Sequence, residues 1–273
     1  MTSQETTRQE TTRQEMTRQE MTGEELLARV LHRDGLMLVI DKPAGIAVHR
    51  HPRKSEGCLE DYFDALRYGL PRNPSLAHRL DRDTSGCLVL GRHRKALEKL
   101  GLLFKQGRIG KTYWAVVEGH PKGTEGLIDL PLGTLEPGRG WWMKVDPSGM
   151  PSQTRWRVMG TGKAEGRPLA FIAFEPLTGR THQLRVHAAA MGWPILGDPI
   201  YGHGGACAPP SERGRAEGAA LHLHAREIVV PLPKDRPTRV TAPVPAHMQQ
   251  RLAMCGWEGE EPSAAAVAPL SAG

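Results

Sequence analysis

At 273 residues the chain is long enough to bury a substantial core, and one large domain with small additions is the expected organisation. Its 36 Lys and Arg residues against 30 Asp and Glu give a formal net charge of +6 at pH 7, a balance that favours a polyanionic partner. The sequence argues against a membrane-spanning or secreted protein, because its longest clean apolar run, Leu36–Ile40, is far too short for a bilayer and its polar N-terminus lacks a signal-peptide pattern.

Low-complexity segments flank the central part of the chain. Residues 1–25 divide into the pentads MTSQE, TTRQE, TTRQE, MTRQE and MTGEE, which contain almost no apolar side chains. Such a segment cannot bury a core, and its period matches neither a heptad nor a solenoid repeat, so we expect a disordered arm. Residues 258–273 are rich in Ala, Pro and Ser and are expected to form a disordered tail. A single folded domain is then expected over residues 30–255.

Strand-like and helix-like patterns follow one another irregularly in this domain. A short apolar run closed by Lys-Pro-Ala-Gly predicts a strand over residues 36–41, and a helical period of apolar residues predicts a helix over 59–68. Since the strands lack strict βαβ alternation, we predict an α+β fold with a mixed, mostly antiparallel sheet and flanking helices. Further strands are predicted over 86–91, 111–118, 153–158, 169–174, 221–232 and 238–241, helices over 93–104 and 180–191, and loops over 133–140 and 202–218.

The cysteines give no sign of a metal or disulfide framework. Cys58, Cys87, Cys207 and Cys255 form no C-x-x-C pair, and their spacing matches no zinc motif. Cys87 lies in an apolar strand and is expected to be a small core residue. Reduced thiols in a cytosolic protein fit this pattern best.

The densest group of polar side chains is the run HRLDRDTSG at residues 78–86, which leads directly into an apolar strand. Its last four residues suit a turn, since Asp, Thr and Ser side chains bond to local backbone and Gly tolerates positive φ. For Asp-Arg-Asp alone, a structural turn with an ion pair is the simpler explanation. Charged groups at this density before a buried strand nevertheless indicate a functional site.

Two further segments carry distinctive patterns. Residues 111–119, KTYWAVVEG, form an alternating strand in which Lys111, Tyr113 and Ala115 share one face, although an ordinary half-buried strand would look the same. Residues 176–187, PLTGRTHQLRVH, suit a loop that enters a helix. His182 and His187 are five residues apart and do not share a helix face as an i, i+4 metal pair would, so we predict no metal site.

Other enzyme classes lack their signatures in this chain. The sequence contains no G-x-S-x-G elbow, no P-loop and no G-x-G-x-x-G after a strand. A sugar hydrolase would need a second carboxylate at a defined distance from the first. Asp83, Glu175 and Asp198 are candidates for that role, and the sequence leaves this alternative open.

Taken together, these segments resemble the RluA-type RNA pseudouridine synthases. The run at 78–86 matches that family's H-R-L-D-x-x-T-S-G pattern without a mismatch, and 111–119 resembles its K-x-Y-x-A-x-V-x-G segment. Residues 176–187 resemble its T-G-R-x-H-Q-x-R-x-H motif, and residues 197–202 and 223–225 match two further segments. The resemblance covers the whole expected domain and implies the pseudouridine synthase fold, with a central RNA-binding cleft.

This resemblance implies that the protein isomerises uridine in RNA to pseudouridine without a cofactor. The N1–C1′ bond breaks, the uracil turns, and C5 bonds to C1′. The motif match assigns the essential carboxylate to Asp81, its cationic partner to Arg180, and the aromatic ring that packs on the uracil, and helps to remove the C5 proton, to Tyr113. Asp81 would either attack covalently or remove a sugar proton, and the sequence leaves both routes open.

The resemblance also implies how RNA would be held. Arg79 matches an arginine that takes the space of the flipped base, where guanidinium stacking offsets part of the unstacking cost. The other expected RNA contacts are His78, Arg82, Lys111, His182 and Arg185, and the candidate phosphate contacts near them are Arg92, Arg94, Lys95, Lys99, Lys105 and Arg108.

Only the arm and a few residues precede the first predicted strand, which is too little for the small RNA-binding module of many relatives. The chain therefore resembles the short members of the family. We expect a cytoplasmic monomer, with no metal and no membrane partner, that acts on a stem-loop of ribosomal or transfer RNA presenting an accessible uridine. The main alternative is an RNA-binding or RNA-chaperone protein on the same fold, against which the intact set of Asp81, Tyr113 and Arg180 argues.

Overall fold

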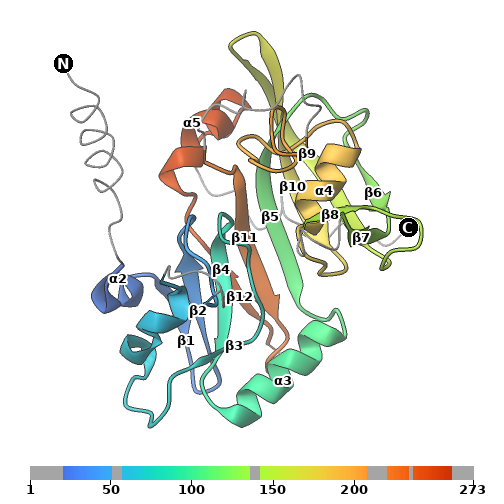
Figure 1. The fold of residues 1–273 in the computed structure, drawn as a ribbon. Helices are drawn as coiled ribbons and strands as arrows, with labels where there is room; N and C mark the ends of the chain where they lie inside the picture. Colours follow the sequence, from blue (N-terminus) through green and yellow to red (C-terminus); the bar gives the residue numbers. More distant parts are fainter. Residues whose placement is uncertain (1–20, 51–56, 136–141, 208–219, 234–235, 260–273) are drawn as a thin grey trace, which may run out of the picture.

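The computed structural model describes residues 21–50, 57–135, 142–207, 220–233 and 236–259, and one large sheet organises them (Figure 1). The strands of this sheet are β1 Val30–Arg33, β2 Met37–Lys42, β3 Ser75–Leu76, β4 Ser85–Gly91, β5 Gly110–Glu118, β6 Glu125–Asp129, β9 Gln153–Ala164, β10 Arg167–Pro176, β11 Leu223–Val230 and β12 Thr238–Thr241. They follow the order β1-β2-β4-β11-β5-β10-β9-β6, with β3 beside β4 and β12 beside β11. Among these described strands every neighbouring pair is antiparallel except β4 and β11, which are parallel. A separate hairpin pairs β7 Leu132–Thr134 with β8 Met143–Val145.

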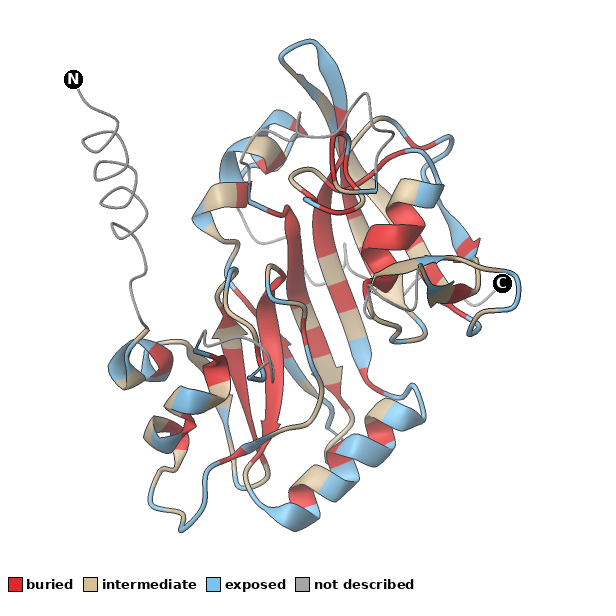
Figure 2. Cartoon of the chain, viewed as in Figure 1, coloured by how far each residue is buried: buried red, intermediate tan, exposed pale blue. Residues whose placement is uncertain are grey.

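Helical segments cover both faces of the sheet. They are α2 Gly23–Leu27, the 3-10 helix η1 Leu59–Leu66, α3 Arg94–Lys105, α4 Gln183–Ala190 and α5 Ala246–Met254. In β2, Leu38 and Ile40 pack in one core cluster with residues of α2 and η1, whereas Met37 and Val39 pack in another with residues of α3. Because both faces are covered, residues 37–40 of β2 and 87–90 of β4 are apolar at every position rather than at alternate ones, and both strands are buried along almost their whole length (Figure 2).

Strands β5, β10, β9 and β6 form the other half of the sheet, and different helices cover its two faces. Ala115 and Val117 of β5 share a core with residues of α4, and Trp114 and Val116 on the opposite face share a core with residues of α5. Tyr113 packs against both the α4 core and the α2–η1 core. It therefore marks the line on the sheet where the two halves meet.

The predicted α+β fold with a mostly antiparallel sheet is confirmed, and the main strand patterns fall on strands. Two helix predictions need correction. The segment predicted as a helix over 59–68 is helical but forms a 3-10 helix ending at Leu66. The helix predicted from Arg180 begins only at Gln183, because His182 has a left-handed backbone conformation and caps it.

Further corrections concern segments expected to lack structure. Residues 23–25, assigned to the arm, begin α2, in which Thr22 and Glu25 form a capping box and Leu26 is fully buried. Residues 1–20 of the arm and 260–273 of the tail lie outside the described residues, so their predicted disorder stays a prediction. Gly133 and Thr134, expected in a loop, belong to β7. The sequence patterns missed β1, β3, β6, β8 and α5.

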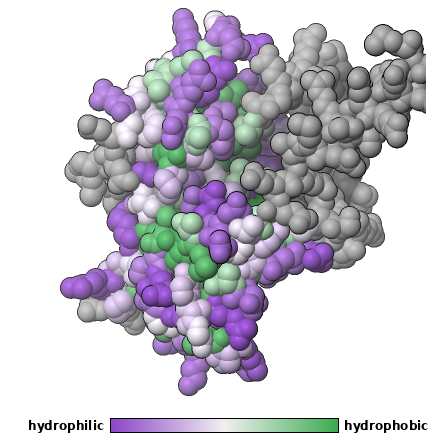
Figure 3. Space-filling view, turned by 90° about the vertical axis from the view of Figure 1, so that its left-hand side faces the viewer, coloured by the Kyte–Doolittle hydropathy of each residue, from purple (hydrophilic) through white to green (hydrophobic). Residues whose placement is uncertain are grey.

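Two observations relate to the predictions of no membrane partner and of a monomer. Within the described residues no helix combines the length and the apolar character needed to cross a membrane. On the face drawn in Figure 3, hydrophilic residues surround a compact hydrophobic patch. The monomer prediction rested on the lack of an evident apolar patch in the sequence, and it stays a prediction.

Gly86 at the start of β4 allows the closest backbone approach between the two parallel strands. Its φ is +105°, and a Cβ added there would overlap with the carbonyl oxygen of Ala225. We expect Gly86→Ala to lower the free energy of unfolding by about 2–4 kcal/mol in urea denaturation, since both the backbone and the contact become strained. Gly101→Ala is the control: Gly101 lies in α3 with no atom within 4 Å of an added Cβ, and this change should raise stability by about 0.5–1 kcal/mol. Equal stabilities of the two variants would contradict this account of the β4–β11 contact.

Candidate active site

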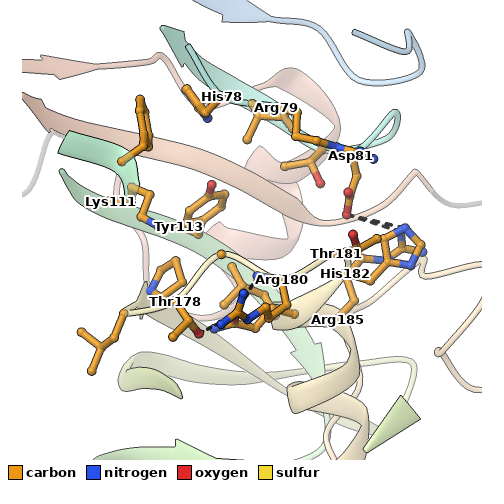
Figure 4. Close-up of a pocket in the computed structure, with 18 of the residues that line it drawn as sticks. His78, Arg79, Asp81, Lys111, Tyr113, Thr178, Arg180, Thr181, His182 and Arg185 are labelled. Atoms are coloured by element: carbon orange, nitrogen blue, oxygen red, sulfur yellow. Dashed lines mark hydrogen bonds and ion pairs between the residues drawn. The ribbon is translucent and has the colours of Figure 1, made fainter. Parts of the chain in front are cut away.

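A cavity of about 520 Å³ lies where the two halves of the sheet meet (Figure 4). This volume is within the range of roughly 300–1,000 Å³ that small-molecule sites occupy. Its walls bring together the three segments that the sequence singled out: residues 78–84, residues of β5, and residues 176–185. Phe104 and Lys105, at the end of α3, complete the rim.

Asp81 lies in a turn of the cavity wall, and the buried side chain of Lys42 stabilises that turn. The Thr84 amide donates to the Asp81 carbonyl at 3.2 Å. The Nζ of Lys42, at the end of β2, donates to the carbonyl oxygens of Pro43, Arg82 and Thr84 at 2.7, 2.8 and 2.9 Å. Burial lowers the pKa of Lys42 to about 7, although the charges of Asp83 and Asp81 oppose that shift. Sequence reasoning missed Lys42, and the available signal was a lysine at the end of a strand that is otherwise mostly apolar.

The guanidinium nearest to Asp81 belongs to Arg185, not to Arg180 as predicted. Nη1 of Arg185 lies 3.7 Å from Oδ2 of Asp81, whereas Nε of Arg180 donates to the Pro151 carbonyl at 3.2 Å. Both arginines line the cavity. The difference follows from the helix boundary: Arg180 precedes α4, while Arg185 lies in its first turn and faces Asp81 (Figure 4).

Arg185 is held in place by a second carboxylate, Asp198. Nε and Nη2 of Arg185 each donate to Asp198 at 2.7 Å, and both side chains are almost completely buried. Asp198 Oδ1 also accepts the amides of Ile200 and Tyr201 at 2.9 and 3.0 Å. Burial opposes the charge of Arg185, but the bonds and the charge of Asp198 outweigh it and raise the pKa of Arg185. This pairing leaves Nη1 directed at Asp81.

His182 provides the second polar group that faces Asp81. Its Nε2 lies 3.9 Å from Asp81 Oδ2, and its Nδ1 lies 2.8 Å from the hydroxyl of Tyr201. Burial is the main effect on its imidazole and lowers the pKa below the usual range. The ring is therefore neutral near pH 7.

Tyr113 and Lys111 project from β5 into the cavity, as the period of two predicts. Burial, with a smaller contribution from the charge of Asp81, raises the pKa of Tyr113. The phenol therefore keeps its proton near neutral pH. Burial lowers the pKa of Lys111.

The remaining predicted RNA contacts differ in their placement. Arg79 is exposed at the cavity. His78 lines the cavity too, but its ring serves the fold: Nε2 accepts the Val89 amide at 3.0 Å, and the ring stacks on Phe104 at 4.5 Å. Burial lowers the pKa of His78 to about 3, so it carries no charge for a phosphate at neutral pH. Arg82 is not part of the cavity wall and donates to the Gly45 carbonyl at 3.0 Å.

Two of the side chains considered for metal binding or hydrolysis, His187 and Asp198, are engaged elsewhere. His187 contacts Thr154 Oγ1 at 2.9 Å and the Leu130 carbonyl at 3.0 Å. Asp198, a candidate second carboxylate, is committed to Arg185. Within the part of the chain that the structure describes, no three His, Cys, Asp or Glu side chains are grouped so that they could hold a metal ion.

Comparisons with a family profile, with related sequences and with a solved structure all point to the same family. Residues 36–190 match the sequence profile of the family described as "RNA pseudouridylate synthase". An uncharacterized RNA pseudouridine synthase of Zymomonas mobilis is 42% identical over 222 residues, which cover 81% of this chain and 95% of that protein. Ribosomal large subunit pseudouridine synthase C of Vibrio cholerae is 35% identical over 226 residues, covering 82% of this chain and 68% of that protein. The solved structure of human RNA Pseudouridylate Synthase Domain Containing 4 superposes with a TM-score of 0.70 at 26% identity, over 85% of this chain and 95% of the other.

The buried pair of Arg185 and Asp198 should contribute strongly to stability. Asp198→Asn leaves a buried guanidinium without its carboxylate, and we expect the free energy of unfolding to fall by about 3–5 kcal/mol in urea denaturation. The exposed pair of Arg94 and Glu98, at 2.9 Å, is the matched control, and Glu98→Gln should cost about 0.5 kcal/mol or less. A small loss of stability in Asp198→Asn would mean that another group neutralises the buried charge of Arg185.

Proposed function

This chain belongs to the RNA pseudouridylate synthase family, and from that premise we propose that its cavity receives a uridine flipped out of a structured RNA and that Asp81 carries the exchange of the glycosidic bond. The protein is an RNA pseudouridine synthase, an isomerase. The observation that carries the proposal is the Asp81 carboxylate in the cavity wall, 3.7 Å from the buried guanidinium of Arg185 and on the same cavity as Tyr113. Family membership also favours catalysis over the alternative of a non-catalytic RNA-binding protein.

The surroundings of Asp81 suit both chemical routes. The positive charge of Arg185 stabilises negative charge on the carboxylate, and an ionised carboxylate is needed either to attack C1′ or to remove a sugar proton. The Asp81 side chain is 20% exposed, so a ribose that enters the cavity can reach it. Arg185 therefore takes the role that the sequence assigned to Arg180.

Tyr113 and Arg79 suit the task of holding the base outside its stack. Flipping a nucleotide costs a few kcal/mol, which contacts to the extruded base and to the vacated space must offset. The Tyr113 ring lies inside the cavity, where it can pack on a uracil, and the exposed Arg79 guanidinium lies at the same cavity, where it can stack in the RNA. We infer these roles for the two residues.

The choice of RNA, the compartment and the oligomeric state complete the proposal. We infer that the target is a stem-loop of ribosomal or transfer RNA and that the protein acts as a cytoplasmic monomer. The name of the Vibrio cholerae relative refers to the large ribosomal subunit, and this favours ribosomal RNA over transfer RNA as the target.

Nucleotide-resolution mapping of pseudouridine in ribosomal and transfer RNA tests the function directly. We expect a site that disappears when the gene is deleted, returns with the wild type and does not return with Asp81→Asn. With purified protein, Asp81→Asn should lower the rate at least about 1,000-fold and leave RNA binding intact, since only the reacting carboxylate is removed. Asp83→Asn is the matched control and should restore the modification. Restoration by Asp81→Asn would refute the role of Asp81, and a wild type inactive on total RNA would favour the RNA-binding alternative.

Lys105, exposed at the cavity rim, is predicted to contact an RNA phosphate. We expect Lys105→Ala to weaken binding similarly for all RNA sequences and to make the slope of log K against log salt concentration shallower by about 0.7–0.9. This slope is measured by filter binding at salt concentrations from about 50 to about 200 mM. Lys163→Ala, an exposed lysine of β9, is the control and should keep the wild-type slope. An unchanged slope for Lys105→Ala would place the RNA backbone elsewhere.

A further inference from the structure

The segment 197–202 lies behind the two groups that face Asp81, and the reaction itself does not assign it a role. We propose that Tyr201 is a positioning residue that holds the imidazole of His182 with its Nε2–H directed at the Asp81 carboxylate. This inference rests on the proposed role of Asp81. It concerns a residue that touches another side chain rather than the reacting atoms.

The hydroxyl of Tyr201 is placed to donate to His182. Its oxygen accepts the Met143 amide at 2.9 Å and lies 2.8 Å from His182 Nδ1. Burial raises the pKa of Tyr201 to about 12, so the phenol keeps its proton. Because the Met143 amide already uses one lone pair, the phenolic O–H is free to point at Nδ1 as a donor.

The opposite side of the imidazole selects the same tautomer. Nε2 faces Oδ2 of Asp81 at 3.9 Å, and an ionised carboxylate can only accept hydrogen bonds. A proton on Nε2 is therefore favoured, and Nδ1 is left as the acceptor that the Tyr201 hydroxyl requires. Both neighbours favour the same tautomer and so hold the ring in one orientation, while burial keeps the ring neutral against the charge of Asp81.

The backbone of His182 and the contacts of Tyr201 support this positioning role. His182 has φ 53° and ψ 18°, a left-handed conformation that residues with a side chain rarely adopt and that is concentrated at functional sites. Tyr201 is fixed as well, because its amide donates to Asp198 and its ring lies 5.3 Å from the Arg185 guanidinium. The turn from Asp198 to Tyr201 thus supports both groups that face Asp81.

The charge state of His182 should depend on the Tyr201 hydroxyl. Removing that hydroxyl takes away the donor that stabilises the neutral ring, so the pKa of His182 should rise. An imidazolium would then pair with Asp81 at a pH where the wild-type ring is still neutral, and the acidic limb of the pH–rate profile should move to higher pH. Among the described residues, Asp81, Arg185, Asp198 and Arg79 exert the electrostatic influences on His182, and the Tyr201 hydroxyl contacts its Nδ1.

Tyr201→Phe tests the proposal, since it removes the hydroxyl and keeps the ring against Arg185. Activity is followed as tritium release from ribosomal and transfer RNA transcripts labelled at uracil C5, because C5 loses its hydrogen when it bonds to C1′. We expect kcat to fall about five- to tenfold, KM and RNA affinity to stay within about twofold, and the acidic limb to shift to higher pH. ¹⁵N NMR of histidine-labelled protein should show the Nε2–H tautomer of His182 in the wild type and a mixture in the variant. Tyr68→Phe, whose ring packs beneath Arg33 instead, is the control.

A second pair of variants separates positioning from folding. His182→Gln keeps an N–H near the Nε2 position, and it should retain several-fold more kcat than His182→Ala. Equal activity of these two, or an unchanged tautomer and pH profile in Tyr201→Phe, would overturn the proposal. A loss of kcat matched by equal losses of RNA affinity and thermal stability would also overturn it, in favour of a structural role. A wild type that releases no tritium would refute the proposed function instead, and the NMR measurement would still decide whether Tyr201 sets the tautomer.

Discussion

Asp81 can lie in a largely buried wall because the guanidinium of Arg185 is 3.7 Å away and is itself held in one orientation. Asp198 takes Nε and Nη2 of that guanidinium, which leaves Nη1 for Asp81. A bidentate pair fixes both the position and the plane of an arginine, so the negative charge at the cavity has a partner that cannot swing away. The turn that carries Asp81 is fixed separately, through the three carbonyl groups bound by Lys42. The geometry of the site is thus decided by groups that lie behind it.

Local patterns in the sequence predicted much of the fold. The apolar runs of β2 and β4 were recognisable because both faces of these strands are covered, and β12 has the predicted bounds of Thr238–Thr241. The alternation that placed Lys111 and Tyr113 on one face of β5 also holds. Short edge strands such as β1 and β3 escaped prediction, because their few residues carry no clear period and are defined by their pairing with β2 and β4.

The candidate site was predictable in its segments but not in its pairings. The motif around residue 180 contains two arginines, and only the observed start of α4 at Gln183 shows that Arg185 faces Asp81 while Arg180 contacts the Pro151 carbonyl. His78 was expected to contact RNA, yet its ring accepts a backbone amide of β4. In both cases the direction of a side chain depends on contacts between segments far apart in the sequence, which spacing within a motif does not contain.

The parallel contact between β4 and β11 bears on when the protein becomes active during its synthesis. Ser85 contacts His224, a residue that follows it by 139 positions in the chain. Ribosomes add roughly 5–20 residues per second, so about 7–28 s pass between the synthesis of these two partners. During that interval the Asp81 segment exists without the strand that borders it in the finished sheet. We therefore expect activity to begin only after almost the entire domain has left the exit tunnel.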